Sequence, residues 1–509
     1  MEYARRYYLP VTVCITGACV LVLEIVATRM LAPYFGNTIY TVSSVLSIVL
    51  AALSCGYYLG GRMADSRPDK KLFFGIILAS GLAVLIMQMS HETLLSLLGR
   101  HVSLTVGPLV AGMLLFFAPS FLLGTLSPYA IKLAEMQRQK HGIGSIAGEI
   151  FFFSTVGSIF GSLLTGYVLI PHLHISTIVG LAGSVLVVLG AAPLLYVWRA
   201  DYKRAGLAVL IIAVFVFTAC VPQHAGAVVY TTNGVYQQLT IRDHIENGRP
   251  VRYLYEDNSL AGAMYLDNDN QLYSKYQDYF VLPEVVQRRT PKHVAILGGG
   301  MYIAPKALLK QYADVQVDTV EIEPELPKMA ETYFGLPKSP RLAHHVTDGR
   351  RFLQDTSTAY DMIYSDVYLS LYATPPHLTT KEFFKTAYAA LKPDGLFLAN
   401  IIDSMDNHNQ SVLRAEIQTL RQVFPTVYVF TTRGQTAKGL QNFVVVGSKN
   451  KTSFDFTAPQ FAQNRYQIVR ELAGAQVSFA RLGVAGYPVL TDNYAPVENW
   501  MTTLDRRLL

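Results

Sequence analysis

Cysteine is absent from the second half of this sequence. The four cysteines of the 509-residue chain all fall in apolar segments of the first half, at Cys14, Cys19, Cys55 and Cys220. Residues 225–509 therefore contain neither a disulfide framework nor a cysteine-ligated metal site. The absence of disulfides does not show in which cellular compartment these residues lie.

Charged residues are also scarce, because only 15% of the chain is charged and 51% is hydrophobic. Soluble domains are about 25% charged. The deficit lies in residues 1–223, a series of long apolar runs, whereas residues 224–509 have the composition of an ordinary globular protein. The composition predicts a membrane part and a soluble part large enough for its own core. The net charge of +6 comes with basic loops between apolar segments, so we interpret it as membrane orientation rather than nucleic-acid binding.

The first half is expected to be a transmembrane domain of seven helices over residues 1–223, each near the roughly 20 residues needed to cross a bilayer. Pro119 and Pro128 predict a kink in the fourth. Basic residues gather at the amino terminus and in the second, fourth and sixth loops, which places the amino terminus in the cytoplasm. The expected spans are residues 9–31, 41–61, 72–89, 106–131, 148–170, 175–197 and 205–222.

An odd number of crossings leaves residues 224–509 outside the cytoplasm, on an inner cell membrane that the chain crosses several times. Most soluble cofactors are made inside the cell. Either a span is miscounted, or the soluble part does not use a soluble cytoplasmic cofactor.

The second half is organised around the stretch HVAILGGGMYIA, residues 293–304. The short apolar run His293–Leu297 is typical of a buried parallel strand. It ends in Gly298, Gly299 and Gly300, which let the backbone turn tightly and approach a ligand. Glu321 ends the next apolar segment, 23 residues after Gly298, a spacing that suits a ribose hydroxyl pair. The pattern predicts a nucleoside site; the alternative is an ordinary strand, turn and helix.

Strand-like segments divide the second half into two predicted parts. Residues 224–290 are expected to form a small antiparallel β domain. Residues 291–509 alternate strands with helices and are expected to form a doubly wound, Rossmann-like methyltransferase sheet. The strands expected there are residues 293–297, 315–321, 342–347, 362–365, 396–401, 426–430 and 443–446.

Further polar residues follow the expected strands, at the edge where open α/β sheets bind ligands. Asp348 and Gly349 follow the third strand, and the aspartate could accept a hydrogen bond from an adenine amino group or belong to a simple turn. Asp366 ends the fourth strand and could take a proton from an attacking nucleophile, or cap a helix. Tyr276 with Gln277, and Gln237 in the small β domain, are each consistent with either a binding role or an exposed polar position.

Taken together, these motifs resemble the polyamine aminopropyltransferases, the spermidine synthase family. The likeness covers about residues 230–401, and the segments EIVATRMLAPYFGNTIY, YYLGGRMAD and TDNYAPVENW resemble its multispan membrane branch. By this resemblance Asp366 would be the proton acceptor for an attacking amine. The nucleoside-binding residues would be Gln237, Gly298, Gly299, Gly300, Glu321, Asp348 and Gly349, and the substrate-binding residues would be Tyr276, Gln277 and Tyr368.

Two positions depart from the pattern of that family. Met301 stands where an aspartate would bind the ammonium of decarboxylated S-adenosylmethionine, and Leu369 stands where a second aspartate would hold the diamine. Each such charge-assisted contact is worth roughly 1.5–3 kcal/mol, so losing both would weaken recognition by about two orders of magnitude. Tyr302, Tyr364 and Tyr368 could still hold a cation against an aromatic face, or a flat or lipid-like acceptor.

The resemblance implies a membrane-bound enzyme that transfers a group from decarboxylated S-adenosylmethionine, or S-adenosylmethionine itself, to an amine acceptor. No metal and no nucleic acid is expected, and a homodimer is a further expectation. The alternatives are an S-adenosylmethionine-dependent transferase with a membrane-associated acceptor, and a non-catalytic transport or sensor protein that retains the domain.

Overall fold

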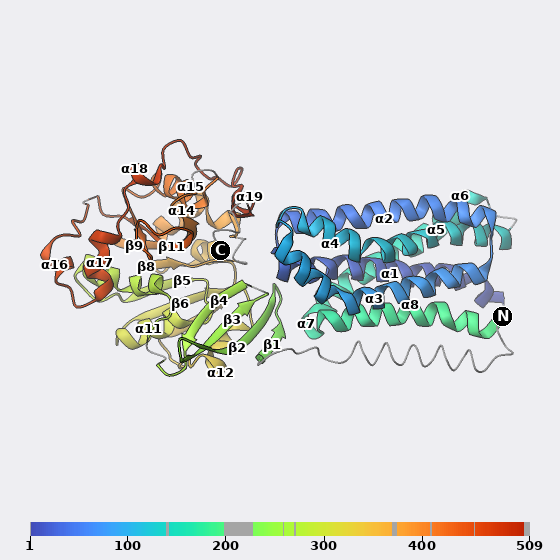
Figure 1. Cartoon of the computed structure of the whole chain (residues 1–509), viewed down its shortest axis with the longest axis horizontal. Helices are drawn as coiled ribbons and strands as arrows, with labels where there is room; N and C mark the ends of the chain where they lie inside the picture. The colour runs from blue at the N-terminus through green and yellow to red at the C-terminus, as the bar shows by residue number, and fades with distance from the viewer. Residues whose placement is uncertain are drawn as a thin grey trace. The chain divides into compact units, whose positions relative to one another are not determined.

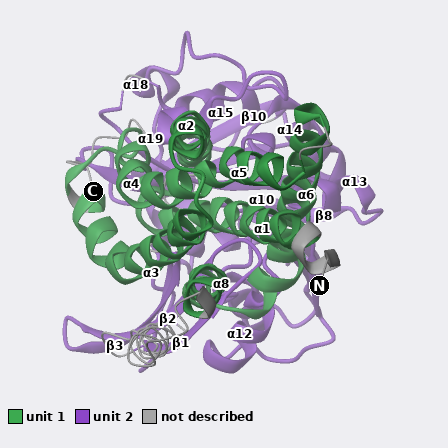
Figure 2. Ribbon diagram, turned by 90° about the vertical axis from the view of Figure 1, so that its right-hand side faces the viewer, with its two compact units in different colours: residues 1–226 green, residues 227–509 purple. Residues whose placement is uncertain are grey.

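The computed structural model describes residues 2–138, 142–197, 228–257, 259–268, 271–368, 374–407, 410–451 and 453–502. The chain forms two compact units, residues 1–226 and residues 227–509, which Figure 2 colours separately. Figure 1 labels many of the elements of both units.

Unit 1 is helical. Among its described residues, five helical stretches are long and apolar enough to cross a membrane. The helices are α1 (Glu2–Phe35), α2 (Ile39–Ser66), α3 (Lys70–His101), α4 (Gly107–Leu115), α5 (Phe117–Gln137), α6 (Ile143–Leu164), the π-helical turn η1 (Thr165–Leu169), α7 (Ile170–His172) and α8 (Ile175–Val197). The apolar stretches are Tyr7–Phe35, Ile39–Ser66, Lys70–Gly99, Ile143–His172 and Ile175–Leu195. Helices α4 and α5 together make a sixth candidate, and the predicted seventh span, residues 205–222, lies outside the described residues.

The kink predicted in the fourth span is confirmed. Helices α4 and α5 meet at Phe116 with a bend of 54°. Pro119 is the third residue of α5 and has no N–H to donate to the carbonyl of Leu115, four residues earlier. Pro128 lies further along, inside α5.

Small residues allow the helices of unit 1 to pack closely in pairs. A Cβ on Gly60 of α2 would lie 2.6 Å from the Cα of Thr125 on α5, and a Cβ on Gly161 of α6 would lie 2.8 Å from the Cα of Ala18 on α1. Backbones this close leave no room for a side chain, which is the usual role of glycine between apolar helices.

Unit 2 begins with a four-stranded antiparallel sheet in the order β1-β2-β3-β4. Its strands are β1 (Val228–Asn233), β2 (Gln238–Glu246), β3 (Arg249–Glu256) and β4 (Ser259–Tyr265). The sequence indicated strands over parts of the first three. It gave no separate signal for β4, because the segment Ala-Gly-Ala has low strand propensity. The 3₁₀ helix η2 (Lys275–Val281) and helix α10 (Leu282–Gln287) follow.

A seven-stranded sheet in the order β10-β11-β9-β8-β5-β6-β7 forms the rest of the framework. Strands β5 to β9 are parallel, and β11 runs antiparallel to both neighbours. The strands are β5 (His293–Leu297), β6 (Gln316–Glu321), β7 (Leu342–Val346), β8 (Tyr360–Ser365), β9 (Leu391–Ser404), β10 (Thr426–Thr431) and β11 (Leu440–Ser448). This order confirms the predicted Rossmann-like methyltransferase fold.

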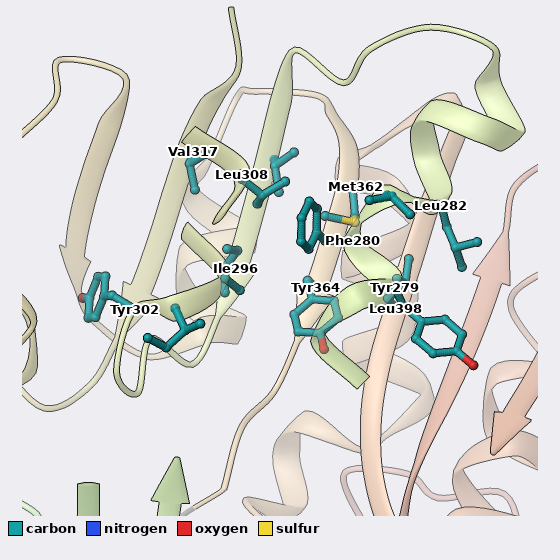
Figure 3. Packing of buried hydrophobic residues seen from close by; sticks show 14 of the residues in the cluster. Tyr279, Phe280, Leu282, Ile296, Tyr302, Leu308, Val317, Met362, Tyr364 and Leu398 are labelled. Atoms are coloured by element: carbon teal, nitrogen blue, oxygen red, sulfur yellow. The ribbon is translucent and has the colours of Figure 1, made fainter. Parts of the chain in front are cut away.

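Helices cover both faces of this sheet. They are α11 (Ile303–Gln311), α12 (Leu326–Tyr333), α13 (Gly349–Asp355), the 3₁₀ turn η3 (Pro376–Leu378), α14 (Lys381–Ala390), α15 (Val412–Leu420), α16 (Pro459–Ala462), α17 (Gln467–Ala475), α18 (Phe479–Leu482) and α19 (Val497–Thr502). Alternate residues of the central strand belong to different cores: Ile296 to one face, Ala295 and Leu297 to the other. Figure 3 shows the first face, with Ile296 between Tyr302 and Tyr364 in that view.

Candidate active site

The glycine turn follows β5 and packs against the residue that follows β8. Gly298 has φ +89° and Gly300 has φ +48°, a region that L side chains rarely adopt. The Asp366 N–H donates to the Leu297 carbonyl at 2.8 Å, and a Cβ on Gly298 would collide with the Asp366 carbonyl. The turn therefore needs glycine at this position, and it brings Asp366 directly beside the turn.

Glu321, at the end of β6, holds the other side of the turn. Its Oε2 accepts from the N–H groups of Gly299 at 2.8 Å and Gly300 at 3.3 Å, and its Oε1 accepts from the Glu323 N–H at 2.9 Å. Burial raises the pKa of Glu321, although these amide donors oppose the rise. The structure thus brings together the glycines and the acidic residue that the sequence singled out, with the carboxylate ordering the turn.

Two carboxyl groups that the sequence did not single out position Gln237. The fully buried Glu323 accepts from the backbone N–H groups of Val235 at 3.1 Å and Tyr236 at 2.9 Å. Gln237, the next residue, is buried, and its side chain hydrogen-bonds to Glu256 of β3. Burial and the nearby charge of Glu321 hold the pKa of Glu256 well above its usual range. Long-range packing creates this arrangement, and no local pattern in the sequence indicated it.

Asp348 and Gly349 lie where helix α13 begins. One carboxylate oxygen of Asp348 caps the helix, accepting from the N–H groups of Arg350 and Arg351 at 3.0 Å. The other faces Nε2 of His377 at 2.7 Å. The hydrogen bond with His377 is the main cause of the lowered pKa of Asp348.

The carboxyl-terminal segment is tied to the same helix. Arg350 makes two 2.7 Å contacts with the carboxylate of Asp492, which also accepts from the Thr380 hydroxyl at 2.8 Å. Through Asp492, this ion pair holds the segment TDNYAPVENW beside Asp348 and His377.

Asp366 is held by side chains from two other elements. Its Oδ1 accepts from Nδ2 of Asn400 on β9 at 2.8 Å, and it also hydrogen-bonds to Tyr276 of η2. Burial raises the pKa of Asp366, and the two hydrogen bonds oppose the rise. Asn442 donates to Oδ1 of Asn400 at 2.9 Å, which leaves the amide nitrogen of Asn400 to face the carboxylate. The sequence patterns did not single out Asn400. The only indication in the sequence is that a polar residue lies within an otherwise apolar strand.

The proposed substrate residues gather around Asp366. Tyr276 hydrogen-bonds to Asp366 and Gln277, and its backbone carbonyl accepts from the Tyr364 hydroxyl at 3.3 Å. Oε1 of Gln277 is buried and has no hydrogen-bond partner among the described residues. The Tyr368 hydroxyl donates to the Asn400 carbonyl at 3.2 Å and accepts from the Ile402 N–H at 2.8 Å.

Met301 is buried against the small sheet. A Cβ on Gly262 of β4 would lie 2.6 Å from the Met301 sulfur, so the thioether packs directly on that strand. The next residue, Tyr302, has φ +59°, and its ring lies against Gly299. Leu369, the other departure from the family pattern, lies outside the described residues.

Within the described ranges, no group of three or more His, Cys, Asp or Glu side chains is placed to hold a metal ion. His345, which follows His344 on β7, is instead bound to Asp318, with Nε2 and Oδ1 2.7 Å apart.

The sheet order and the glycine turn define a Rossmann-like protein of the methyltransferase type. Residues 275–457 match the spermine/spermidine synthase domain. The chain is 28% identical to polyamine aminopropyltransferase 1 of Aquifex aeolicus over 216 residues, 40% of this chain and 70% of the relative. It is 23% identical to polyamine aminopropyltransferase 2 of Streptomyces coelicolor over 431 residues, 77% of this chain and 73% of the relative.

Two solved structures are also similar. A probable spermidine synthase from Corynebacterium glutamicum covers 52% of this chain and 97% of its own, with 21% identity and a TM-score of 0.45. The match with spermidine synthase from Thermotoga maritima covers 51% of this chain and 88% of that protein, with 20% identity and a TM-score of 0.40. The family resemblance inferred from the motifs is confirmed by the matched domain and the curated relatives: the chain is a polyamine aminopropyltransferase-like enzyme that carries a spermine/spermidine synthase domain.

Proposed function

We propose that this chain is a membrane-bound aminopropyltransferase that moves an aminopropyl group from decarboxylated S-adenosylmethionine, or a close relative, to an amine acceptor. One observation carries the proposal. Asp366 lies beside the glycine turn and is oriented by Asn400 and Tyr276, so a carboxylate is fixed next to the expected nucleoside position.

The reaction needs little more than alignment and a base. The acceptor nitrogen attacks the methylene next to the sulfonium, so a C–N bond forms while the C–S bond breaks and its electron pair passes to sulfur. The products are the alkylated amine and methylthioadenosine. Asp366 accepts the proton that the amine loses, and burial favours this role because it raises the pKa of the carboxyl group.

The nucleoside of the donor would lie along the same edge of the sheet as Asp366, beside the carboxyl ends of β6 and β7. Glu321 and Gln237 would bind the ribose and thioether region, and Asp348 with Gly349 would contact adenine. Buried carboxylates that accept from backbone amides are already oriented for such hydroxyl groups, and Glu321 is of this kind.

Unit 1 would anchor the enzyme in the inner membrane. Five stretches long and apolar enough to cross a bilayer, with the bent α4–α5 pair as a sixth, support this placement. The Streptomyces coelicolor relative matches 77% of the chain, more than residues 227–509 alone could supply, so the likeness extends into the helices. A homodimer is part of the proposal on the family resemblance alone.

Met301 supports a second candidate, a transferase that uses intact S-adenosylmethionine and a membrane-associated acceptor. A buried thioether replaces the carboxylate that would bind the donor's ammonium. This substitution weakens the case for a decarboxylated donor without affecting the nucleoside residues.

Calorimetry on the full chain in detergent separates the candidates. Decarboxylated S-adenosylmethionine and methylthioadenosine should bind, and the former should be consumed when an amine is added. Binding and turnover of S-adenosylmethionine alone would favour the second candidate. Failure of all three compounds to bind would leave a non-catalytic transport or sensor role.

A further inference from the structure

His377 is a polar residue of the site to which neither the sequence patterns nor the proposed mechanism gives a role. It lies in the 3₁₀ turn η3, and its Nε2 is 2.7 Å from a carboxylate oxygen of Asp348. The pKa of Asp348 is lowered, chiefly by this hydrogen bond, so the carboxyl group is charged at neutral pH and can only accept hydrogen bonds. The proton between the two groups therefore belongs to His377, which is the donor.

The hydrogen bonds of the Asp348 side chain leave it one free acceptor position. An ionised carboxylate can accept about four hydrogen bonds, two at each oxygen. One oxygen accepts from the backbone N–H groups of Arg350 and Arg351, both at 3.0 Å, and the other accepts from His377. The Asp348 side chain is 30% exposed, so a ligand can reach the remaining position. A single N–H or O–H of a ligand would fill it.

This free position lies on the nucleoside side of the sheet edge. Asp348 follows β7, and the N–H of the preceding residue, Thr347, donates to the carbonyl of Glu321 at 3.2 Å. Asp348 is thus held next to the strand whose last residue would bind the ribose. An amino group on the base would supply the one N–H that Asp348 can still accept, whereas a base without an amino group would leave the position empty.

The position of His377 is fixed by its own backbone. Two prolines precede it and restrict the chain, and the next residue, Leu378, is buried. The His377 carbonyl accepts from Arg350 at 3.4 Å, and Arg350 makes two 2.7 Å contacts with Asp492. The imidazole N–H therefore approaches Asp348 from a fixed direction, whether or not a ligand is bound.

We propose that His377 is a positioning residue that gives Asp348 its selectivity for the 6-amino group of the donor's adenine. This inference rests on the proposed nucleoside site and adds the residue that orients its base-reading carboxylate. With the His377 hydrogen bond in place, the second oxygen is held still and has one acceptor position to offer. Without that bond the oxygen is hydrated at both positions and held less firmly, so the amino group gains less by replacing water.

The test compares two nucleosides that differ only in the amino group. Calorimetry on the full chain in detergent measures Kd for methylthioadenosine and for its analogue with hydrogen in place of the 6-amino group. The wild-type chain should bind methylthioadenosine roughly 10- to 100-fold more tightly, the effect of one hydrogen bond to a charged group.

Two variants of similar size separate the hydrogen bond from the volume of the side chain. His377→Gln keeps an N–H donor and should retain the preference. His377→Met has no donor and should reduce the preference roughly 10-fold, through weaker binding of methylthioadenosine alone. The His377 side chain is 49% exposed, so both variants are expected to fold. His345→Met is the matched control and should keep the wild-type preference, because His345 forms a pair of the same 2.7 Å length with Asp318.

Three results would each overturn the assignment: the same preference in His377→Gln and His377→Met, equal weakening of both nucleosides by His377→Met, or a wild-type chain that does not distinguish the nucleosides. A preference reduced as much in His345→Met would also overturn it. If the wild-type chain binds neither nucleoside, the proposed function itself fails.

Discussion

Asn400 orients the proposed base, and its own orientation is fixed by Asn442. Its amide donates to Asp366 and opposes the rise in pKa that burial causes. Without that donor the carboxyl group would be both less well placed and harder to ionise. A single neutral side chain thus couples the geometry of the site to its pH dependence.

We expect Asn400→Leu to lower kcat roughly 10- to 100-fold and to move the acid limb of the kcat/KM profile to higher pH. The sign follows from the lost hydrogen bond: the pKa of Asp366 rises, and the base must be deprotonated to act. A pH–rate profile measures this shift. Asn464→Ala, at a half-buried position whose side chain bonds only to Gln460 and Tyr466, should leave the profile unchanged. If the acid limb of Asn400→Leu lies at the same pH as that of the wild type, Asn400 does not act on Asp366.

At the residue scale, the sequence indicated the parts of the site that follow strand ends. Gly298, Glu321 and Asp366 each come directly after an apolar run, and parallel strands bring such positions to one edge. Asn400 and Glu256 could not be found in this way. Asn400 lies inside β9 and Glu256 ends β3 of the small antiparallel sheet, and only the pairing and packing of those strands decides what the two side chains face.

The turn between β1 and β2 is the element that places Gln237. Glu323 accepts from two of its N–H groups, at Val235 and Tyr236, and a Cβ on Gly234 would collide with the same carboxylate. The small sheet is therefore attached to the glycine-turn region by a buried carboxylate rather than by apolar contact alone.

Replacing Glu323 with Ala should destabilise the chain by about 1–3 kcal/mol, because two partly buried N–H groups lose their acceptor. Donor KM should rise as well, since Gln237 is no longer held in place. Thermal unfolding and donor titration measure the two effects. If the variant is destabilised but its KM for the donor is unchanged, the turn between β1 and β2 does not contribute to donor binding.

Asp361 ties together the starting ends of three strands. It is fully buried, pairs with Lys392 at 2.8 Å and with Arg289, and accepts from the N–H groups of Lys292 and His293. Burial alone would raise the pKa of Asp361, but these partners outweigh burial and hold the pKa below its usual value. The carboxyl group is therefore charged at neutral pH.

Asp361→Asn should cost about 3–5 kcal/mol of stability at neutral pH, because it leaves two cations facing a neutral amide. Because the pKa of Asp361 is lowered on folding, the wild-type advantage is present above the unfolded pKa and is lost as pH falls through the folded one. Unfolding midpoints at several pH values test this. An equally stable variant at pH 7 would contradict it.

At the scale of elements, periodicity predicted every strand of the large sheet, because a buried parallel strand is a short apolar run between polar turns. It did not predict that β9 extends from Leu391 to Ser404, since Pro393, Asp394 and Gly395 read as a turn in sequence. Leu391 pairs with Tyr360 and Leu396 pairs with Met362, so residues 392–395 form an irregularity within the strand rather than its end.

The whole molecule combines a transferase domain with a set of apolar helices, and loop charge is what the sequence offers on orientation. Six of the seven predicted spans correspond to helical stretches, counting the bent α4–α5 pair as one, and the seventh lies outside the described residues.

Fusion of compartment-specific reporters to residue 509 tests the topology. Seven crossings from a cytoplasmic amino terminus predict activity of a reporter that works only outside the cytoplasm. Activity of a cytoplasmic reporter instead would mean an even number of crossings. It would also place the domain in the compartment where the adenosyl donor is made.

The central claim is that Asp366 acts as the base at a nucleoside site, and its most direct test is the Asp366→Asn variant of the full chain. Methylthioadenosine should bind the variant as tightly as the wild type, because the nucleoside residues are untouched. Turnover of decarboxylated S-adenosylmethionine with an amine should fall at least 100-fold, within the range that general-base catalysis contributes. Wild-type turnover by Asp366→Asn would contradict the account.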